Sequence, residues 1–115
     1  MVNEERVARV TDQNYPGFLE VPASVVVFGM VPCQQCEEYD PIFRKVATLY
    51  NGSVKFGKAK MHVPGACREI KRKYKFESFP TTHFYRDGTL VHKTEGKLDF
   101  ETLTQTIRKV LLNLT

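Results

Sequence analysis

The apolar run SVVVFG at residues 24–29 is the feature that most limits how this chain can fold. β-Branched and aromatic side chains favour extended backbone, and a run with no alternating polar positions is typical of a strand covered on both faces. Strands of that kind lie inside parallel sheets, whose crossover connections place helices on both faces. The run therefore predicts a central parallel strand in an α/β protein and excludes an edge strand.

The segments around this run alternate between strand and helix patterns. A mixed central sheet of about five strands, flanked by about four helices, accounts for that order. The short connection at residues 86–88 contains a glycine and favours a hairpin between the last two strands. The remaining strands are expected at residues 7–11, 54–61, 81–85 and 90–95. The helices are expected at residues 15–20, from the cysteines to about residue 50, at 64–74 and after residue 99.

Local signals predict the ends and faces of these helices. Asp12 or Asn14 is expected to cap the first helix, and Asp99 the last. Pro32 suits the first turn of the second helix, where a missing N–H needs no partner. Pro41 lies inside that helix and predicts a kink. The apolar stripe of the second helix comprises Ile42, Phe43, Val46, Leu49 and Tyr50. In the last helix, the residues expected to face the sheet are Phe100, Leu103, Ile107, Val110 and Leu111.

Length and composition favour a globular chain without a membrane segment. Of its 115 residues, 42% are apolar and 26% are charged, and this length predicts a single domain over residues 1–115. No run approaches the roughly 18 apolar residues that cross a bilayer, and the N-terminus lacks the layout of a signal peptide. We therefore expect a cytoplasmic monomer with no membrane partner.

Three cysteines are too few for a disulfide framework. Cys33 and Cys36 close too small a loop to restrict an unfolded chain, so a structural bridge is not expected. At the start of a helix, free backbone N–H groups and the helix dipole stabilise a thiolate. We expect Cys33 to attack a disulfide and Cys36 to resolve the mixed disulfide that forms.

A metal site is the alternative interpretation of the same pair, because CxxC is also half of a zinc site and occurs in shared iron–sulfur clusters. His62 and Cys67 are the candidates for further ligands, but their spacing matches no second metal-binding motif. The placement of the pair after a buried strand and at the start of a helix favours redox chemistry. No metal or other cofactor is expected.

Further segments resemble the thioredoxin family over nearly the whole chain. VTDQNY at residues 10–15 is similar to the family's opening strand and helix, and SVVVFG precedes the cysteines as its central strand does. Pro41, five residues after Cys36, resembles the family's helix-kinking proline. ESFPTTHFYRDGTL at residues 77–90 resembles the segment in which a cis-proline begins the fourth strand. The resemblance implies the thioredoxin fold and a thiol–disulfide oxidoreductase.

The resemblance also implies a substrate groove beside the cysteines. Pro80 is the expected cis-proline and should lie against Cys33, leaving the Phe79 backbone free to pair with an extended substrate. The whole expected groove consists of Pro32, Phe79, Pro80, Thr81 and Gly96. Protein disulfides are the expected substrates, and a thioredoxin reductase or a small thiol is the expected electron donor.

Several positions depart from the family pattern. The family's WCGPC reads PCQQC here, and the two residues between the cysteines influence redox poise. Val27 stands where thioredoxins bury an aspartate that helps to move the proton of the second cysteine. Lys58 matches the lysine near that acid, as a candidate proton-transfer or electrostatic group, and is expected to lack a partner. The resulting hypothesis is slower reduction, because Cys36 must lose its proton to water or another group.

The remaining polar residues carry weaker signals. The basic residues gathered in residues 58–75 predict a solvated face, with an acidic partner or a nucleic acid as the alternatives, of which no nucleic acid is expected. Cys67 is expected to be a small buried hydrophobe, with a regulatory or dimer-forming thiol as the alternative, and the three histidines to be surface or strand residues. A rival to the enzyme is a thioredoxin-fold binding module that uses the groove beside Pro80 without turnover.

Overall fold

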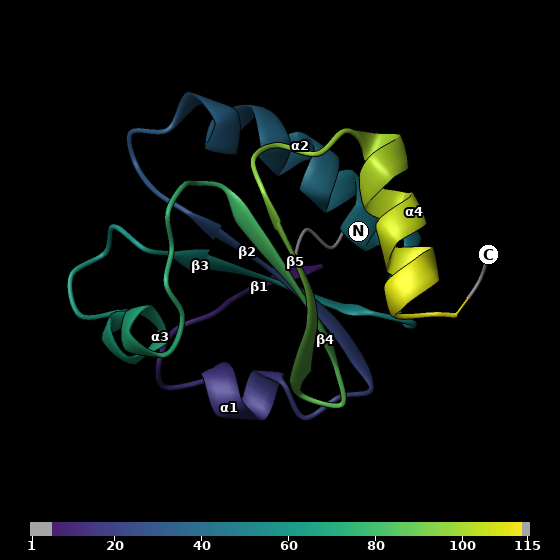
Figure 1. The fold of residues 1–115 in the computed structure, drawn as a ribbon, viewed down its shortest axis with the longest axis horizontal. Helices are drawn as coiled ribbons and strands as arrows, with labels where there is room; N and C mark the ends of the chain where they lie inside the picture. The colour runs from purple at the N-terminus through teal and green to yellow at the C-terminus, as the bar shows by residue number, and fades with distance from the viewer. Residues whose placement is uncertain (1–5, 114–115) are drawn as a thin grey trace, which may run out of the picture.

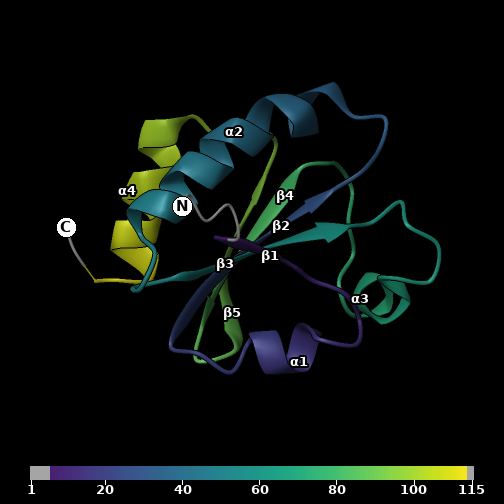
Figure 2. The same ribbon diagram turned by 180° about the vertical axis from the view of Figure 1, so that it is seen from behind.

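The computed structural model describes residues 6–113. A five-stranded mixed sheet with the order β1-β3-β2-β4-β5 forms its centre. Along the chain, the elements are β1 (Val7–Arg9), α1 (Tyr15–Phe18), β2 (Ala23–Gly29), α2 (Gln34–Leu49), β3 (Lys55–Lys60), α3 (Arg68–Lys73), β4 (Thr81–Arg86), β5 (Thr89–Glu95) and α4 (Phe100–Val110). Helices α2 and α4 cover one face of the sheet, and α1 and α3 lie on the other (Figure 1 and Figure 2). The predicted α/β class is confirmed.

Strand β2 is buried along its whole length, between its parallel partner β3 and its antiparallel partner β4. Val25 and Val27 pack into the apolar cluster beneath α2 and α4. Val26 and Phe28 pack into the cluster beneath α1 and α3. Because successive side chains of a strand point to opposite faces, a strand covered on both faces needs apolar residues at every position. The prediction of a central strand is confirmed.

The start of α2 differs from the prediction. Cys33 is the N-cap, with extended backbone, and its Sγ accepts a hydrogen bond from the Cys36 N–H at 3.1 Å. Pro32 follows a cis peptide bond with Val31 and precedes the cap, so it is not in the first helical turn. The prediction for Pro32 was wrong because the cysteine takes the position whose side chain satisfies a free amide of the helix.

Two residues assigned to the buried faces of the helices are exposed. Leu49 is 61% exposed. Consecutive helical side chains point about 100° apart around the helix axis, so Leu49 points away from the direction in which Tyr50 packs against the core. Phe100 is 38% exposed and lies beneath the Lys45 ammonium group of α2, so it does not face the sheet. The other members of the two stripes are buried or half-buried. No helix in the described part of the chain is both long and apolar enough to cross a bilayer.

The residues expected to cap α1 have other partners. Asn14 occupies the N-cap position of α1, as one of the two expected residues, but its side chain makes no cap hydrogen bond, because its Oδ1 accepts one from the Thr11 N–H at 2.8 Å. Asp12 reaches α3, where its carboxylate accepts hydrogen bonds from the amides of Glu69 and Ile70 at 2.8 and 3.0 Å. Asp12 therefore does not cap α1, because its carboxylate satisfies the free amides of a helix that lies far along the chain.

Of the last two helices, α4 begins as the local signals predict and α3 does not. The Asp99 Oδ1 accepts a hydrogen bond from the Thr102 N–H at 2.7 Å, which confirms the predicted cap of α4. Helix α3 begins at Arg68, later than expected, because the preceding residues form a turn in which the Ala66 N–H donates to the Val63 carbonyl.

A buried aromatic network ties α1 and the segment after α3 to β4. The His83 Nδ1 lies 2.8 Å from the Tyr85 hydroxyl, which lies 2.9 Å from the Tyr15 hydroxyl. Tyr15 also hydrogen-bonds Tyr74, and the Phe76 ring stacks on His83. These contacts leave His83 only 1% exposed. It is a strand residue, as expected, but it lies in the core.

Burial, together with the nearby charge of Lys93, lowers the pKa of His83 from 6.5 to about 4. Between these values the unfolded chain binds a proton that the folded chain does not. Stability should therefore fall as the pH drops through this window, by about 3 kcal/mol at most. His83→Asn, which does not titrate, should flatten the dependence, as measured by urea unfolding across this range. His62→Asn, at an exposed site, is the control; an equally steep curve for His83→Asn would contradict the prediction.

Candidate active site

Cys33 and Cys36 form a disulfide at the first turn of α2, with 5.3 Å between their Cα atoms. Both residues are half-buried, so part of the pair is accessible. Strand β2 delivers the chain to this point and ends at Gly29. The Cys36 Sγ lies 3.6 Å from the position that a Cβ of Gly29 would occupy. The disulfide therefore sits directly over the end of the central strand.

The loop before β4 brings a cis-proline to Cys33. The Phe79–Pro80 peptide bond is cis, and the Phe79 carbonyl oxygen lies 3.8 Å from the Cys33 Sγ. Thr81 follows as the buried first residue of β4. From the end of β5, the Gly96 N–H donates a hydrogen bond to the Pro80 carbonyl at 2.8 Å. Segments far apart in the sequence thus meet at one edge of the sheet.

An open hollow of about 700 Å³ lies against the disulfide. Pro32 is exposed and borders it, so this residue also lies next to the cysteines. The hollow is lined by Pro32, Cys33, Gln34, Glu37 and Glu38. Its volume and its contact with Cys33 leave room for a segment of another protein beside the sulfur.

Gln35 and Glu38 connect α2 to the loop after β5, a link that the sequence analysis missed. The Gln35 Oε1 accepts a hydrogen bond from the Lys97 N–H at 3.3 Å and lies 3.9 Å from a Cβ position on Gly96. The Lys97 Nζ donates to Glu38 at 2.7 Å, and the Gln34 Nε2 donates to the same carboxylate at 3.0 Å. These hydrogen bonds, from Lys97 first, lower the pKa of Glu38. The only sequence signal was the hydrogen-bonding capacity of the glutamines.

Lys58 has a partner, so the expectation that it lacks one was wrong. It lies opposite Val27 in the β2–β3 pairing, and its Nζ donates to the Asp40 Oδ1 at 2.8 Å. The Arg44 Nε donates to the other oxygen of Asp40 at 2.8 Å. Burial raises the pKa of Asp40, but the hydrogen bonds from Lys58 and Arg44 outweigh it and hold that pKa below its usual value. The carboxylate comes from α2, one turn after Cys36, instead of from β2.

The third cysteine is not part of the disulfide. Cys67 is 2% exposed, which confirms its expected burial, and its Sγ lies 3.9 Å from the Lys60 carbonyl. Burial raises the pKa of this thiol. Among residues 6–113, no three His, Cys, Asp or Glu side chains are grouped so that they could hold a metal ion. His62 and Cys67 do not join the cysteine pair in such a group.

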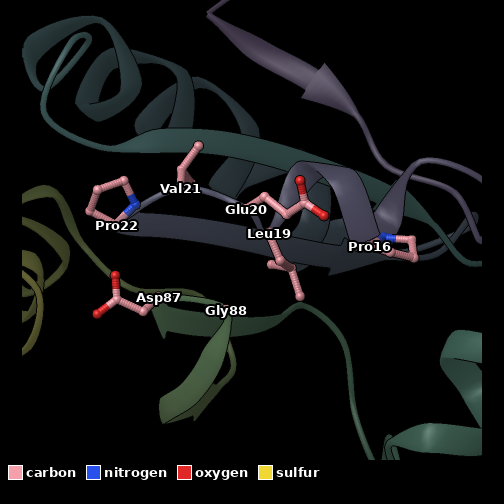
Figure 3. A pocket seen from close by; sticks show the side chains of 7 residues that line it. All are labelled: Pro16, Leu19, Glu20, Val21, Pro22, Asp87 and Gly88. Atoms are coloured by element: carbon pink, nitrogen blue, oxygen red, sulfur yellow. The ribbon is translucent and has the colours of Figure 1, made fainter.

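A second hollow, of about 500 Å³, lies where the chain enters β2 (Figure 3). Pro22 and Asp87 line it from the segments that flank the sheet there, and Leu19 and Glu20 line it from the segment after α1. The disulfide lies beyond the other end of β2. None of the residues expected to act in catalysis or substrate binding lines this hollow, so it is separate from the candidate site.

The fold and the cysteine pair indicate a thiol–disulfide oxidoreductase. The thioredoxin family model matches residues 6–109, and the chain belongs to the thioredoxin family. It is similar to a thioredoxin of Staphylococcus saprophyticus, with 26% identity over 105 residues that span 91% of this chain and 98% of the relative. Family membership indicates oxidoreductase activity and implies, in general, disulfide substrates and a reductase partner.

The Asp40–Lys58 contact can be tested by titration. Replacing Lys58 with methionine should raise the pKa of Asp40, because the carboxylate loses a hydrogen bond and a nearby positive charge. NMR titration of the Asp40 carboxyl carbon measures the change. Arg44→Met is the matched comparison and should give a smaller rise, because Arg44 is more exposed than Lys58. An unchanged pKa in Lys58→Met would show that the contact does not form in solution.

Proposed function

We propose that the chain reduces or exchanges protein disulfides through Cys33 and Cys36. The observation that carries this proposal is the position of the Cys33 sulfur. It lies at the N-cap of α2, bonded to the second sulfur, with the Phe79 carbonyl 3.8 Å away. A thiolate at this position is stabilised by the free amides and the dipole of the helix.

The reaction proceeds by two thiol–disulfide exchanges. In the dithiol form, the Cys33 thiolate attacks one sulfur of the substrate disulfide; that bond breaks, and the departing sulfur takes up a proton. The Cys36 thiol then loses its proton and attacks the Cys33 sulfur. This second step re-forms the protein disulfide and releases the other substrate sulfur. Two electrons pass to the substrate, and a reductase or small thiol returns two electrons and two protons to the chain.

The groove beside the disulfide suits an extended substrate. The Pro80 carbonyl already accepts the Gly96 N–H, whereas the backbone groups of Phe79 make no hydrogen bond to the backbone of residues 6–113. Phe79 can therefore pair with a substrate strand next to Cys33. Pro32 borders the same groove, whereas Thr81 is buried, so in this proposal it holds Pro80 in place from beneath. Gly96 has a φ of 92°, which favours glycine, and in this proposal its lack of a side chain allows a substrate to approach closely.

Neither Val27 nor Asp40 is well suited to act as the base for the second exchange. Val27 supplies no carboxylate, and Asp40 is held by Lys58 and Arg44 with a lowered pKa, which makes it a weak proton acceptor. We infer that Cys36 loses its proton to water or another group. In this account Lys58 acts electrostatically, by offsetting the charge of Asp40.

The proposed setting is the cytoplasm, with the chain acting as a monomeric single domain over residues 1–115. Its partners would be disulfide-containing proteins and a thioredoxin reductase or small-thiol donor, with no nucleic acid and no membrane. The second candidate is a non-catalytic binding module, which Val27 and Pro32 favour because they replace the family's acid and tryptophan. A metal-binding domain is a third and would be seen as bound zinc or colour in the purified protein.

An insulin-reduction assay tests the proposed chemistry. Cys33→Ser should abolish activity, because the attacking sulfur is gone. Cys36→Ser should lose turnover but accumulate a mixed disulfide with the substrate, which mass spectrometry detects. Cys67→Ser is the control and should keep activity. Equal activity in the wild type and Cys33→Ser would rule out the proposed enzymatic function. Partner capture that survives replacement of both Cys33 and Cys36 would support the binding module.

Adding the absent carboxylate tests the proposal for the second exchange. Val27→Asp should speed resolution of the mixed disulfide, because a base would then lie on the face of β2 that supports Cys36. Single-turnover release of the reduced substrate measures this step. Val27→Asn has nearly the same shape and should give no gain. Unfolding curves establish that both variants fold, and a Val27→Asp rate no higher than that of Val27→Asn would contradict the proposal.

A further inference from the structure

The positive charge of the chain is concentrated in one segment. Residues 58–75 contain seven of the seventeen lysines and arginines but only one of the thirteen acidic residues, Glu69. Six of these seven basic side chains are exposed, and Lys58 is the exception. The rest of the chain has more acidic than basic residues. The formal charge of +4 therefore arises from α3 and the segments beside it.

Part of this charge lines a hollow of about 260 Å³ between α3 and the loop before it. Arg68, Lys71 and Arg72 line the hollow from α3, and His62 lines it from the loop. We call these four residues the basic surface. Three fixed positive charges around one concave site favour an anionic group.

Other charges in the described chain neutralise little of the basic surface. Arg72 pairs with Glu69 at 3.2 Å, but the two side chains are 70% and 68% exposed, so the pair is weak. Arg68 and Lys71 form no ion pair with any side chain of residues 6–113. The Asp12 carboxylate lies at the start of α3, where it accepts two backbone amides, and it forms no ion pair with a basic side chain of residues 6–113. The positive charge is therefore available to another molecule.

The loop that leads to the basic surface begins beneath the disulfide. The Met61 N–H donates to the Gly29 carbonyl at 2.8 Å, and Gly29 lies beneath the Cys36 sulfur. The loop that carries His62 therefore starts at the end of β2, where α2 also starts. Figure 1 and Figure 2 both place α3 and this loop at the same edge of the sheet as the start of α2. A protein positioned over Cys33 would extend across this edge.

We propose that the basic surface docks an acidic segment of the protein whose disulfide reaches Cys33. This inference rests on the proposed function and specifies, in addition, that the substrate carries negative charge near its disulfide. Charges at the rim of an interface act on the rate of encounter, and salt weakens them. A nucleic acid is less well suited, because no Phe, Tyr or Trp side chain lines the hollow as a stacking platform for bases.

Kinetics with three synthetic peptides test the proposal. The peptides contain the same single disulfide and differ only in the flanking residues, which are acidic, neutral or basic. At low ionic strength, kcat/KM for the acidic peptide should exceed that for the neutral one by about tenfold, and the basic peptide should be the slowest. About 0.5 M salt should bring the three values together. Arg68→Glu combined with Lys71→Glu should reverse the order.

Arg108→Glu combined with Lys109→Glu is the matched control, because it makes the same change of charge on α4, on the other face of the sheet. This control should keep the preference for the acidic peptide. Hydroxyethyl disulfide, which is small and uncharged, should be reduced equally by the wild type and by both charge variants.

The outcomes separate this inference from the proposed function. If hydroxyethyl disulfide is reduced but the three peptides give equal kcat/KM, the docking surface is wrong and the enzyme stands. If no disulfide is reduced, binding of the acidic peptide is measured by fluorescence anisotropy. Salt-sensitive binding that is lost in Arg68→Glu with Lys71→Glu supports docking without catalysis. No binding overturns both the docking surface and the proposed enzyme. Binding of mixed-sequence single-stranded DNA more tightly than the acidic peptide would assign the surface to nucleic acid and overturn the inference.

Discussion

The site depends on the burial of β2 on both faces. Two apolar clusters, one under α2 and α4 and the other under α1 and α3, hold this strand from opposite sides. Hydrogen-bonded pairing with β3 and β4 sets its position within the sheet. The strand then ends at Gly29, and the Gly29 carbonyl is held by the Met61 N–H. With the end of β2 fixed, Cys33 can serve as the N-cap of α2 at the edge of the sheet.

Contacts between distant segments complete the site around this fixed end. The Phe79 carbonyl approaches Cys33, and the Gly96 amide holds the Pro80 carbonyl. The residues between the cysteines add a feature of their own, because Gln35 accepts the Lys97 amide. The acidic residues that follow the cysteines would oppose a thiolate if they stood alone. Glu38 is paired with Lys97, and Asp40 with Lys58 and Arg44, so much of that charge is offset.

The sequence predicts those parts of the structure that local patterns control. The apolar run at residues 24–29 identifies β2, and Asp99 caps α4 as expected, since both signals act within a few residues. The partner of Lys58 lies 18 residues away, and Asp12 caps a helix that begins 56 residues later. Periodicity and capping preferences contain no information on such pairings, because they depend on how the helices pack on the sheet.

Local patterns also fail to predict which apolar side chains of the helices are exposed to solvent. Leu49 fits an apolar stripe by spacing, but it lies at the rim of the buried face of α2, and Phe100 turns toward Lys45. The cysteine pair could be located from the sequence because its chemistry requires a fixed spacing. The charge around the pair could not be predicted from the sequence, because it depends on the partners of Glu38 and Asp40 in the folded protein. The sequence therefore predicts which residues react, whereas the electrostatics of the site depend on tertiary contacts.

Competitive alkylation of the fully reduced protein measures whether α2 stabilises the thiolate of Cys33. A limiting amount of iodoacetamide is added at neutral pH, and mass spectrometry gives the order in which the three cysteines react. We expect Cys33 to react first and faster than an ordinary exposed cysteine, because its thiolate is stabilised at the start of α2. Faster reaction of Cys36 or Cys67, or a Cys33 rate below that of a cysteine in an unstructured peptide, would contradict it.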